Sequence, residues 1–181
     1  MDLTQVILVD EQDQILGSCE KLEAHRKGFL HRAFSVFVFN RKGEMLLQQR
    51  ARNKYHSGGL WTNACCSHPA MGENTDDAVH RRLVEEMGFD TPAKKLFDFV
   101  YKAEFDNGLT EYEFDHVYSG EYEGEIRCNP DEVMDYCFKP MPAIAESLQT
   151  RPGLYTAWFQ LAFPKIESWW QQQYSTPALT D

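Results

Sequence analysis

The stretch that organises this chain is Trp61-Thr62-Asn63-Ala64-Cys65-Cys66-Ser67-His68-Pro69-Ala70-Met71-Gly72-Glu73. It places a thiol, an imidazole, an indole and a carboxylate in one short segment that runs directly into a helical pattern. Packing alone does not require so many reactive side chains in one turn. We therefore expect this stretch to supply a catalytic cysteine and a metal ligand, and the rest of the chain to supply their partners.

A helix is expected immediately after this stretch. Asn74 or Thr75 can cap its start, and Gly88 can end it. Its apolar residues recur every four positions and form one buried stripe: Val79, Leu83 and Met87. Two ion pairs can form one turn apart, Arg81–Glu85 and Arg82–Glu86, and surface salt bridging is their ordinary interpretation.

Strands are expected on both sides of this helix. Alternating or continuous apolar patterns predict them at residues 6–10, 33–39, 45–50, 96–104 and 110–119, with 33–39 and 45–50 forming a hairpin. Residues 19–30 are interpreted as irregular and 121–135 as a solvated loop, and helical signals begin at Pro140 or Pro142. This order predicts an α/β (α+β) fold, and without repeats or linkers we expect one domain over residues 1–181.

Composition limits the classes of function. The five cysteines are odd in number and include an adjacent pair, which favours reduced thiols over a disulfide framework. The net charge of −10 disfavours nucleic acid as a partner, although a local cluster of cations could still bind a small phosphorylated ligand. Neither a signal peptide nor a membrane-spanning run is recognisable, so a cytoplasmic location is expected.

Histidines and spaced carboxylates suggest a metal site. Three imidazoles and two carboxylates form a set suited to an octahedral divalent ion with one open position: His25, His31, His68, Glu111 and Glu113. Zinc, manganese, magnesium and ferrous iron are all compatible with these ligands. Each residue also has an ordinary structural interpretation: a satisfied histidine, a solvated sheet face, a buried Cys66, or Tyr101 and Trp158 in the core. The other histidines, His56, His80 and His116, follow no evident pattern.

The opening stretch, together with Arg81-Arg82-Leu83-Val84-Glu85-Glu86-Met87-Gly88, resembles the type I isopentenyl-diphosphate Δ-isomerases, divergent members of the Nudix fold. The resemblance extends from about residue 3 to about residue 170 and includes His25, His31, Glu111-x-Glu113 and residues 131–136. It implies a Nudix-like mixed β-sheet sandwich flanked by helices, with an added N-terminal strand and added C-terminal helices. The Nudix-like core would cover about residues 30–165.

Two departures from the hydrolase pattern G-x5-E-x7-R-E-U-x-E-E-x-G-U are informative. Ser67 stands at the opening glycine, and Arg82 stands where a carboxylate is expected after Arg81. An arginine there favours holding a diphosphate over placing a hydrolytic metal. A Nudix-type diphosphate hydrolase remains the alternative function, followed by a non-catalytic metal- or diphosphate-binding module. Ser67 could restrict the backbone if its position needs a positive φ.

The resemblance implies roles for particular residues. The proton-transfer residues would be Cys66 and Glu113, with Tyr101 and Trp158 lining the hydrocarbon pocket. The residues expected to contact the diphosphate are Lys21, Arg50, Lys54 and Arg82. Glu86, with the Cys66 carbonyl, would hold the Mg²⁺ that arrives with the diphosphate. A second divalent ion, Mn²⁺, Zn²⁺ or Mg²⁺, would occupy the site of three histidines and two glutamates.

The implied reaction interconverts isopentenyl diphosphate and dimethylallyl diphosphate by protonation and deprotonation through a tertiary carbocation, a step of isoprene biosynthesis. The implied partner is a small allylic or homoallylic diphosphate, with no nucleic acid and no membrane, bound by a monomer or weak homodimer. Neighbouring side chains of an extended segment point to opposite faces, so only one thiol of the Cys65–Cys66 pair should reach the pocket. We assign that thiol to Cys66.

Overall fold

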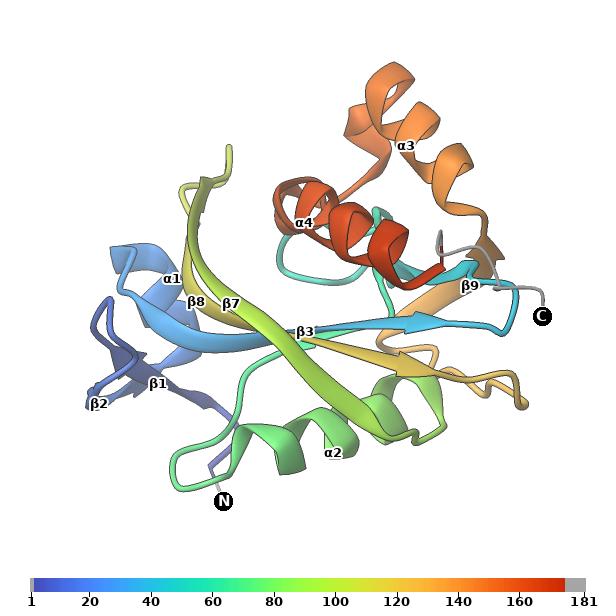
Figure 1. Cartoon of the computed structure of the whole chain (residues 1–181). Helices are drawn as coiled ribbons and strands as arrows, with labels where there is room; N and C mark the ends of the chain where they lie inside the picture. Colours follow the sequence, from blue (N-terminus) through green and yellow to red (C-terminus); the bar gives the residue numbers. More distant parts are fainter. Residues whose placement is uncertain (1, 175–181) are drawn as a thin grey trace.

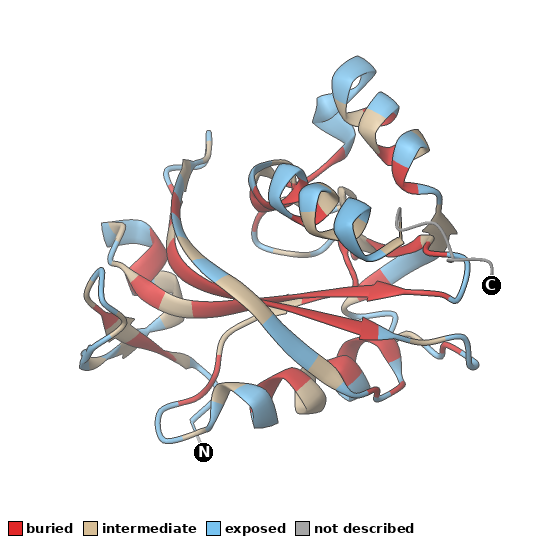
Figure 2. Cartoon of the chain, viewed as in Figure 1, coloured by how far each residue is buried: buried red, intermediate tan, exposed pale blue. Residues whose placement is uncertain are grey.

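Strand β3 (His31–Phe39) is the centre of the fold in this computed structural model, which describes residues 2–174. It pairs in parallel with β8 (Thr110–Glu121) and antiparallel with β1, β4 and β6. β3 is buried along nearly its whole length (Figure 2). Such burial suits its run of aromatic and β-branched residues.

The described residues form one nine-stranded mixed sheet with helices on both sides (Figure 1). The elements in chain order are β1 (Gln5–Val9), β2 (Ile15–Glu20), α1 (Lys21–Lys27), β3, β4 (Met45–Arg50), β5 (Trp61–Asn63), β6 (Cys65–Ser67), α2 (Thr75–Met87), β7 (Ala93–Glu104), β8, β9 (Val133–Lys139), α3 (Met141–Thr150), a 3₁₀ turn (Pro152–Leu154) and α4 (Ala157–Tyr174). The predicted α+β class is confirmed. Among these helices, none combines the length and apolar character that a membrane crossing requires.

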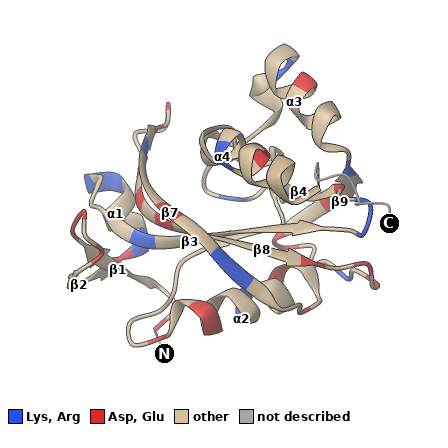
Figure 3. Ribbon diagram, in the orientation of Figure 1, with Lys and Arg blue, Asp and Glu red and all other residues tan. Residues whose placement is uncertain are grey.

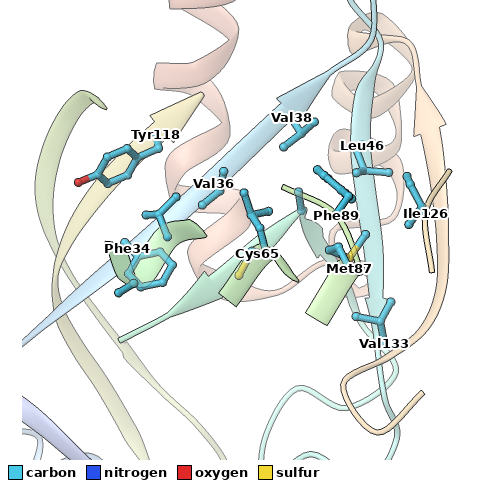
Figure 4. Close-up of a cluster of buried hydrophobic side chains, with 14 residues drawn as sticks. Phe34, Val36, Val38, Leu46, Cys65, Met87, Phe89, Tyr118, Ile126 and Val133 are labelled. Atoms are coloured by element: carbon cyan, nitrogen blue, oxygen red, sulfur yellow. The ribbon is translucent and has the colours of Figure 1, made fainter. Parts of the chain in front are cut away.

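Two cores lie on opposite faces of β3. Phe34, Val36 and Val38 pack with α2 in the first core (Figure 4), whereas Phe37 and Phe39 pack with α3 and α4 in the second. The alternation of side chains along a strand produces this division. α2 therefore covers one face, and α3 and α4 lie on the other (Figure 1).

The predicted central helix is confirmed with both of its caps. The Asn74 side chain accepts a hydrogen bond from the Asp76 N–H, and Gly88 ends the helix in the left-handed region at φ 72°. The expected stripe is buried: Val79, Leu83 and Met87. A side chain at Gly88 would meet the Arg127 carbonyl oxygen at 2.2 Å, so glycine is required there for space as well as for φ.

Replacing Leu83 with alanine is expected to lower the free energy of unfolding by about 2–5 kcal/mol, because it removes a fully buried side chain from the first core. Its neighbour Val84, 52% exposed on the same helix, provides the control. Val84→Ala should change stability by about 0.5 kcal/mol or less. Urea unfolding of both variants measures the difference, and equal stabilities would contradict the assignment of the buried stripe.

Several segments differ from the expectation. Residues 19–30 are not irregular: they complete β2 and form α1, whose N–H groups at Leu22 and Glu23 are capped by the Glu20 carboxylate. Residues 133–135 belong to strand β9, not to a loop, because β9 pairs with β4 over its length. The expected hairpin of β3 and β4 is reduced to the pair Phe39↔Met45, since β4 pairs chiefly with β5 and β9.

Candidate active site

Strand pairing brings the predicted metal ligands together from distant parts of the chain. The parallel register of β3 and β8 aligns His31 with Glu113, and β6 delivers His68 to the same place. His68 Nε2 lies 2.9 Å and His31 Nε2 lies 3.5 Å from Glu113 Oε1. α1 contributes His25, whose ring centroid is 4.9 Å from that of His31.

The tautomers of two histidines suit metal binding. His25 Nδ1 lies 2.7 Å from the Lys21 carbonyl oxygen, and His31 Nδ1 lies 2.8 Å from the Phe29 carbonyl oxygen. Because a carbonyl only accepts, each Nδ1 carries the proton and each Nε2 keeps a free lone pair. Both Nε2 atoms are buried without a hydrogen-bond partner. This arrangement fits a bound cation.

The donor set is compact enough for one ion. Ligand atoms of His25, His31, His68 and Glu113 all lie within 4.8 Å of one another. Burial, then the charge of His31, lowers the pKa of His25, and burial lowers that of His68 well below its usual range. Neutral imidazoles at neutral pH are the form that binds metal. The residues therefore fit a divalent metal.

A tyrosine joins the two predicted carboxylates. The Tyr101 hydroxyl lies 2.6 Å from Glu113 Oε2 and 3.2 Å from Glu111 Oε2. Burial and the Glu113 charge raise the pKa of Glu111 well above its usual range. Burial opposes ionisation of Glu113 as well, but the hydrogen bond from His68 Nε2 holds its pKa well below normal. Of the two carboxyl groups, Glu113 is therefore the one that ionises more readily.

The Cys66 thiol is held from three sides. Its Sγ lies 3.0 Å from Asn63 Oδ1, 3.0 Å from the indole Nε1 of Trp158 and 3.4 Å from Ser35 Oγ. Burial, then the nearby charge of Asp115, raises the thiol pKa, so Cys66 carries its proton at neutral pH. Trp158 reaches this thiol from the first turn of α4 and is itself buried.

The two adjacent thiols point to opposite faces, as expected. Cys65 is fully buried in the first core beside Phe34 and Met87 (Figure 4), whereas Cys66 packs against the second core. Ser67 lies in extended β6, and it is not among the described residues with positive φ. The glycine that opens the hydrolase pattern is therefore not required by the backbone at this position.

The predicted cations surround the same cavity as the reactive groups. Its volume is about 50 Å³, and it is lined by Lys21, Arg50, Lys54, Tyr55, His56, Cys66, Ser67, His68, Arg82, Glu86, Tyr101, Glu111, Glu113 and Trp158. Every predicted site residue lines it except His25 and His31, whose ligand atoms lie within 4.8 Å of those of His68 and Glu113. Burial lowers the pKa of Lys21 to about 8.

The ion pairs of α2 separate into two kinds. Arg82 Nη2 lies 2.5 Å from Glu86 Oε1, and both side chains are largely buried at the cavity. Surface salt bridging is therefore the wrong interpretation of that pair. The predicted Arg81–Glu85 pair also forms, with Nη1 3.2 Å from Glu85 Oε2. Arg81 further binds Glu73 through Nε at 2.7 Å and Nη2 at 2.8 Å, which ties the opening stretch to the helix.

Three residues that contact the site were not identified from the sequence. His56 Nε2 lies 3.2 Å from Glu111 Oε1, and Asn63 and Ser35 contact the Cys66 thiol. His56 comes from an irregular segment with no periodic pattern, so nothing local distinguishes it. Asn63 lies within the opening stretch, and its proximity to Cys66 is the one signal that could have identified it.

The fold and the site together define a NUDIX-domain protein with a group of histidines and carboxylates that fits a divalent metal. A model of the NUDIX domain matches residues 29–159. The crystal structure of DR0079 from Deinococcus radiodurans aligns with a TM-score of 0.74 at 17% identity, over 89% of this chain and 98% of that chain, which supports the fold.

The sequence comparison is more specific. The isopentenyl-diphosphate Delta-isomerase of Pectobacterium atrosepticum is 51% identical over 171 residues, which cover 94% of this chain and 96% of the relative. Isopentenyl-diphosphate Delta-isomerase 2 of Photorhabdus laumondii is 49% identical, over 91% of this chain and 96% of that relative. The chain belongs to the isopentenyl-diphosphate Delta-isomerase family.

Proposed function

We propose that this enzyme interconverts isopentenyl diphosphate and dimethylallyl diphosphate in isoprenoid precursor biosynthesis. The observation that carries the proposal is the placement of a protonated thiol, Cys66, and an ionised carboxylate, Glu113, in one buried cavity ringed by cations. The names of the relatives support the same activity.

The reaction needs one proton added and one removed. A proton added to C4 of isopentenyl diphosphate forms a tertiary carbocation, and loss of a proton from C2 forms the new double bond. Cys66 and Glu113 are the two groups that exchange these protons, with the Tyr101 hydroxyl bonded to Glu113 at 2.6 Å. In the free protein Cys66 carries its proton and Glu113 does not, so one group can donate a proton and the other can accept one.

The carbocation must be stabilised and kept from water, which would trap it as an alcohol. Trp158 is the group that serves both needs. It is 3% exposed and lies on α4, and its indole also contacts the Cys66 thiol. An aromatic face stabilises a desolvated cation by roughly 2 kcal/mol.

Charge complementarity supports the assignment of the diphosphate site. Lys21, Arg50, Lys54 and Arg82 would bind the diphosphate, and Glu86 with the Cys66 carbonyl would hold its Mg²⁺. His25, His31, His68, Glu111 and Glu113 would hold the second ion, Mn²⁺, Zn²⁺ or Mg²⁺. When bound, that ion supplies positive charge that fixes the Glu113 carboxylate.

Replacing Arg82 with glutamine is expected to raise KM for the diphosphate by about 10- to 100-fold, the equivalent of one charge-assisted hydrogen bond of about 1.5–3 kcal/mol. Arg82 is largely buried at the cavity, where its pairing with Glu86 fixes its position. The exposed Arg127, which pairs with Glu125, provides a charge-matched control as Arg127→Gln. Steady-state kinetics measure both variants, and an unchanged KM for Arg82→Gln would contradict its role.

One experiment tests the activity directly. The protein is incubated with isopentenyl diphosphate and Mg²⁺ in D₂O and followed by NMR. Deuterium-labelled dimethylallyl diphosphate is expected. Release of monophosphate or free phosphate would instead identify a Nudix-type hydrolase, and an unchanged substrate would identify a binding module.

We further propose that residues 1–181 form one domain with a core at about 30–165, acting in the cytoplasm as a monomer or weak homodimer without a nucleic-acid or membrane partner. The NUDIX match over residues 29–159 supports the position of the core. All five cysteines are free, which supports a reducing compartment. Acidic and basic segments are interspersed over the fold (Figure 3), unlike the continuous basic face that nucleic acids favour.

A further inference from the structure

We propose that His56 is a positioning residue of the metal centre, which holds the Glu111 carboxylate in the orientation that the ion requires. The inference rests on the metal centre of the proposed function. It assigns a task to a histidine that follows no sequence pattern and that the proton-transfer chemistry does not use.

The contact joins two buried side chains. His56 Nε2 lies 3.2 Å from Glu111 Oε1, with the two side chains 4% and 5% exposed. The other oxygen of the same carboxylate, Oε2, faces the Tyr101 hydroxyl at 3.2 Å. Glu111 is therefore approached at both oxygens by neighbouring side chains, whereas a carboxylate on the bare face of a sheet would rotate freely.

The imidazole ring of His56 is itself held in place. It stacks on Phe105, with ring centroids 4.9 Å apart and planes 15° apart, and it meets Trp158 edge-on at 5.9 Å. Its Nδ1 lies 3.2 Å from Ser57 Oγ. A Ser57 hydroxyl that donates to Nδ1 leaves the ring proton on Nε2, the nitrogen that faces Glu111.

The backbone next to His56 is unusual. Ser57 has φ 53°, a left-handed conformation uncommon for a residue other than glycine. Such conformations persist where the surrounding structure requires them, and they cluster at functional sites. Here the conformation accompanies the short contact between the Ser57 hydroxyl and the His56 ring.

The donor atoms place His56 beside Glu111 at the edge of the metal centre. They form two groups that share His25: one with His31, His68 and Glu113, the other with His56 and Glu111. Because the Nε2 of His56 carries the ring proton and faces Glu111 Oε1, His56 donates to that carboxylate and offers no lone pair to the ion. Groups that orient a metal ligand in this way typically change metal affinity by about 10–100-fold when they are removed.

The test measures Zn²⁺ affinity of the full chain without substrate, by competition with a chromophoric chelator. His56→Ala should weaken binding by about 10–100-fold. His56→Gln should restore most of the affinity, because its side-chain amide can donate to Glu111 from nearly the same place. His80, which pairs with Asp90 at 2.6 Å on the surface, provides the matched control, and His80→Ala should bind like the parent.

A double-mutant cycle separates orientation from direct ligation. In a Glu111→Ala background, His56→Ala should cause no further loss, because the group it orients is gone. A further loss of similar size, failure of His56→Gln to restore affinity, or an unchanged His56→Ala would each overturn the inference. Circular dichroism of the metal-free variants checks folding, and His56→Gln keeps the test decisive should His56→Ala fail to fold.

The results distinguish a failure of the proposed function from a failure of the role given to His56. If the parent neither binds Zn²⁺ nor isomerises, the metal centre and the proposed function both fail, and the role of His56 fails with them. If the parent binds Zn²⁺ and isomerises but His56→Ala binds equally well, only the role of His56 is overturned.

Discussion

Replacing Cys66 with alanine should reduce kcat by about 10²–10⁴-fold, the usual contribution of a positioned acid or base. The thiol is the proton-carrying group on its side of the cavity, and its neighbours Asn63, Ser35 and Trp158 cannot replace it. Asn63 and Trp158 do not titrate near neutral pH, and the Ser35 hydroxyl already donates to Asp115 at 2.8 Å. The NMR assay in D₂O measures the loss as a rate of deuterium incorporation.

The adjacent thiol is the control for this variant. Cys65 packs in the first core, away from the cavity, so Cys65→Ala should leave kcat within a few-fold of the parent. Diphosphate binding and the thermal midpoint of Cys66→Ala should stay close to the parent values, because the mutation removes one sulfur atom. Full activity of Cys66→Ala, or a greater loss from Cys65→Ala, would exclude Cys66 from proton transfer.

Glu113→Gln should lower kcat by at least about 10²–10⁴-fold and should also weaken metal binding. Glutamine preserves the size of the side chain but removes the charge that His31 and His68 contact at 3.5 and 2.9 Å. It also cannot accept and release a proton as a carboxylate does. Kinetics and chelator competition measure the two losses separately.

The control lies on the same hairpin. Glu104 ends β7 with a side chain 75% exposed, so Glu104→Gln should change neither kcat nor metal affinity.

An excess of divalent ion distinguishes the role of His56 from that of Glu113. It should restore turnover to His56→Ala, whose defect is affinity, but not to Glu113→Gln. Complete restoration of Glu113→Gln by excess ion would reduce Glu113 to a metal ligand and contradict its part in proton transfer.

Long periodic segments were predictable because their signals are local. The four-residue spacing of Val79, Leu83 and Met87, with Asn74 and Gly88 as caps, was sufficient to locate α2. The aromatic run of β3 and the alternation of β8 were equally direct. The short α1 was not predictable, because its stability depends on a cap from Glu20 and on packing of His25 and Ala24 against the sheet.

Strand pairing was the least predictable feature of the fold. β9 has an exposed, mixed sequence and becomes a strand because the edge of β4 offers it hydrogen-bond partners. The same strand β4 was expected to pair with β3, but it shares only one residue pair with it. Pairing between segments far apart in the chain depends on the whole sheet, and residue patterns within one segment do not encode it.

The same distinction between local features and contacts of distant segments applies to the site. The sequence by itself determined the types of reactive group and their membership of a family pattern: Cys66 with the spacing to His68, Glu111-x-Glu113 on one face of a strand, and Arg82 in place of a carboxylate. These features follow from spacing along one element, where the geometry of a helix or strand is regular. The spacings alone indicated a metal site and a reactive thiol, and the resemblance to the isopentenyl-diphosphate Δ-isomerases predicted the activity.

The tertiary structure decided which groups meet and in which protonation state. The parallel register of β3 and β8 places His31 beside Glu113, α4 brings Trp158 to the Cys66 thiol, and an irregular segment brings His56 to Glu111. Burial then keeps the proton on the thiol, while the hydrogen bond from His68 keeps the Glu113 carboxylate ionised. These properties arise from desolvation and from contacts between distant segments, which exist only once the chain has folded.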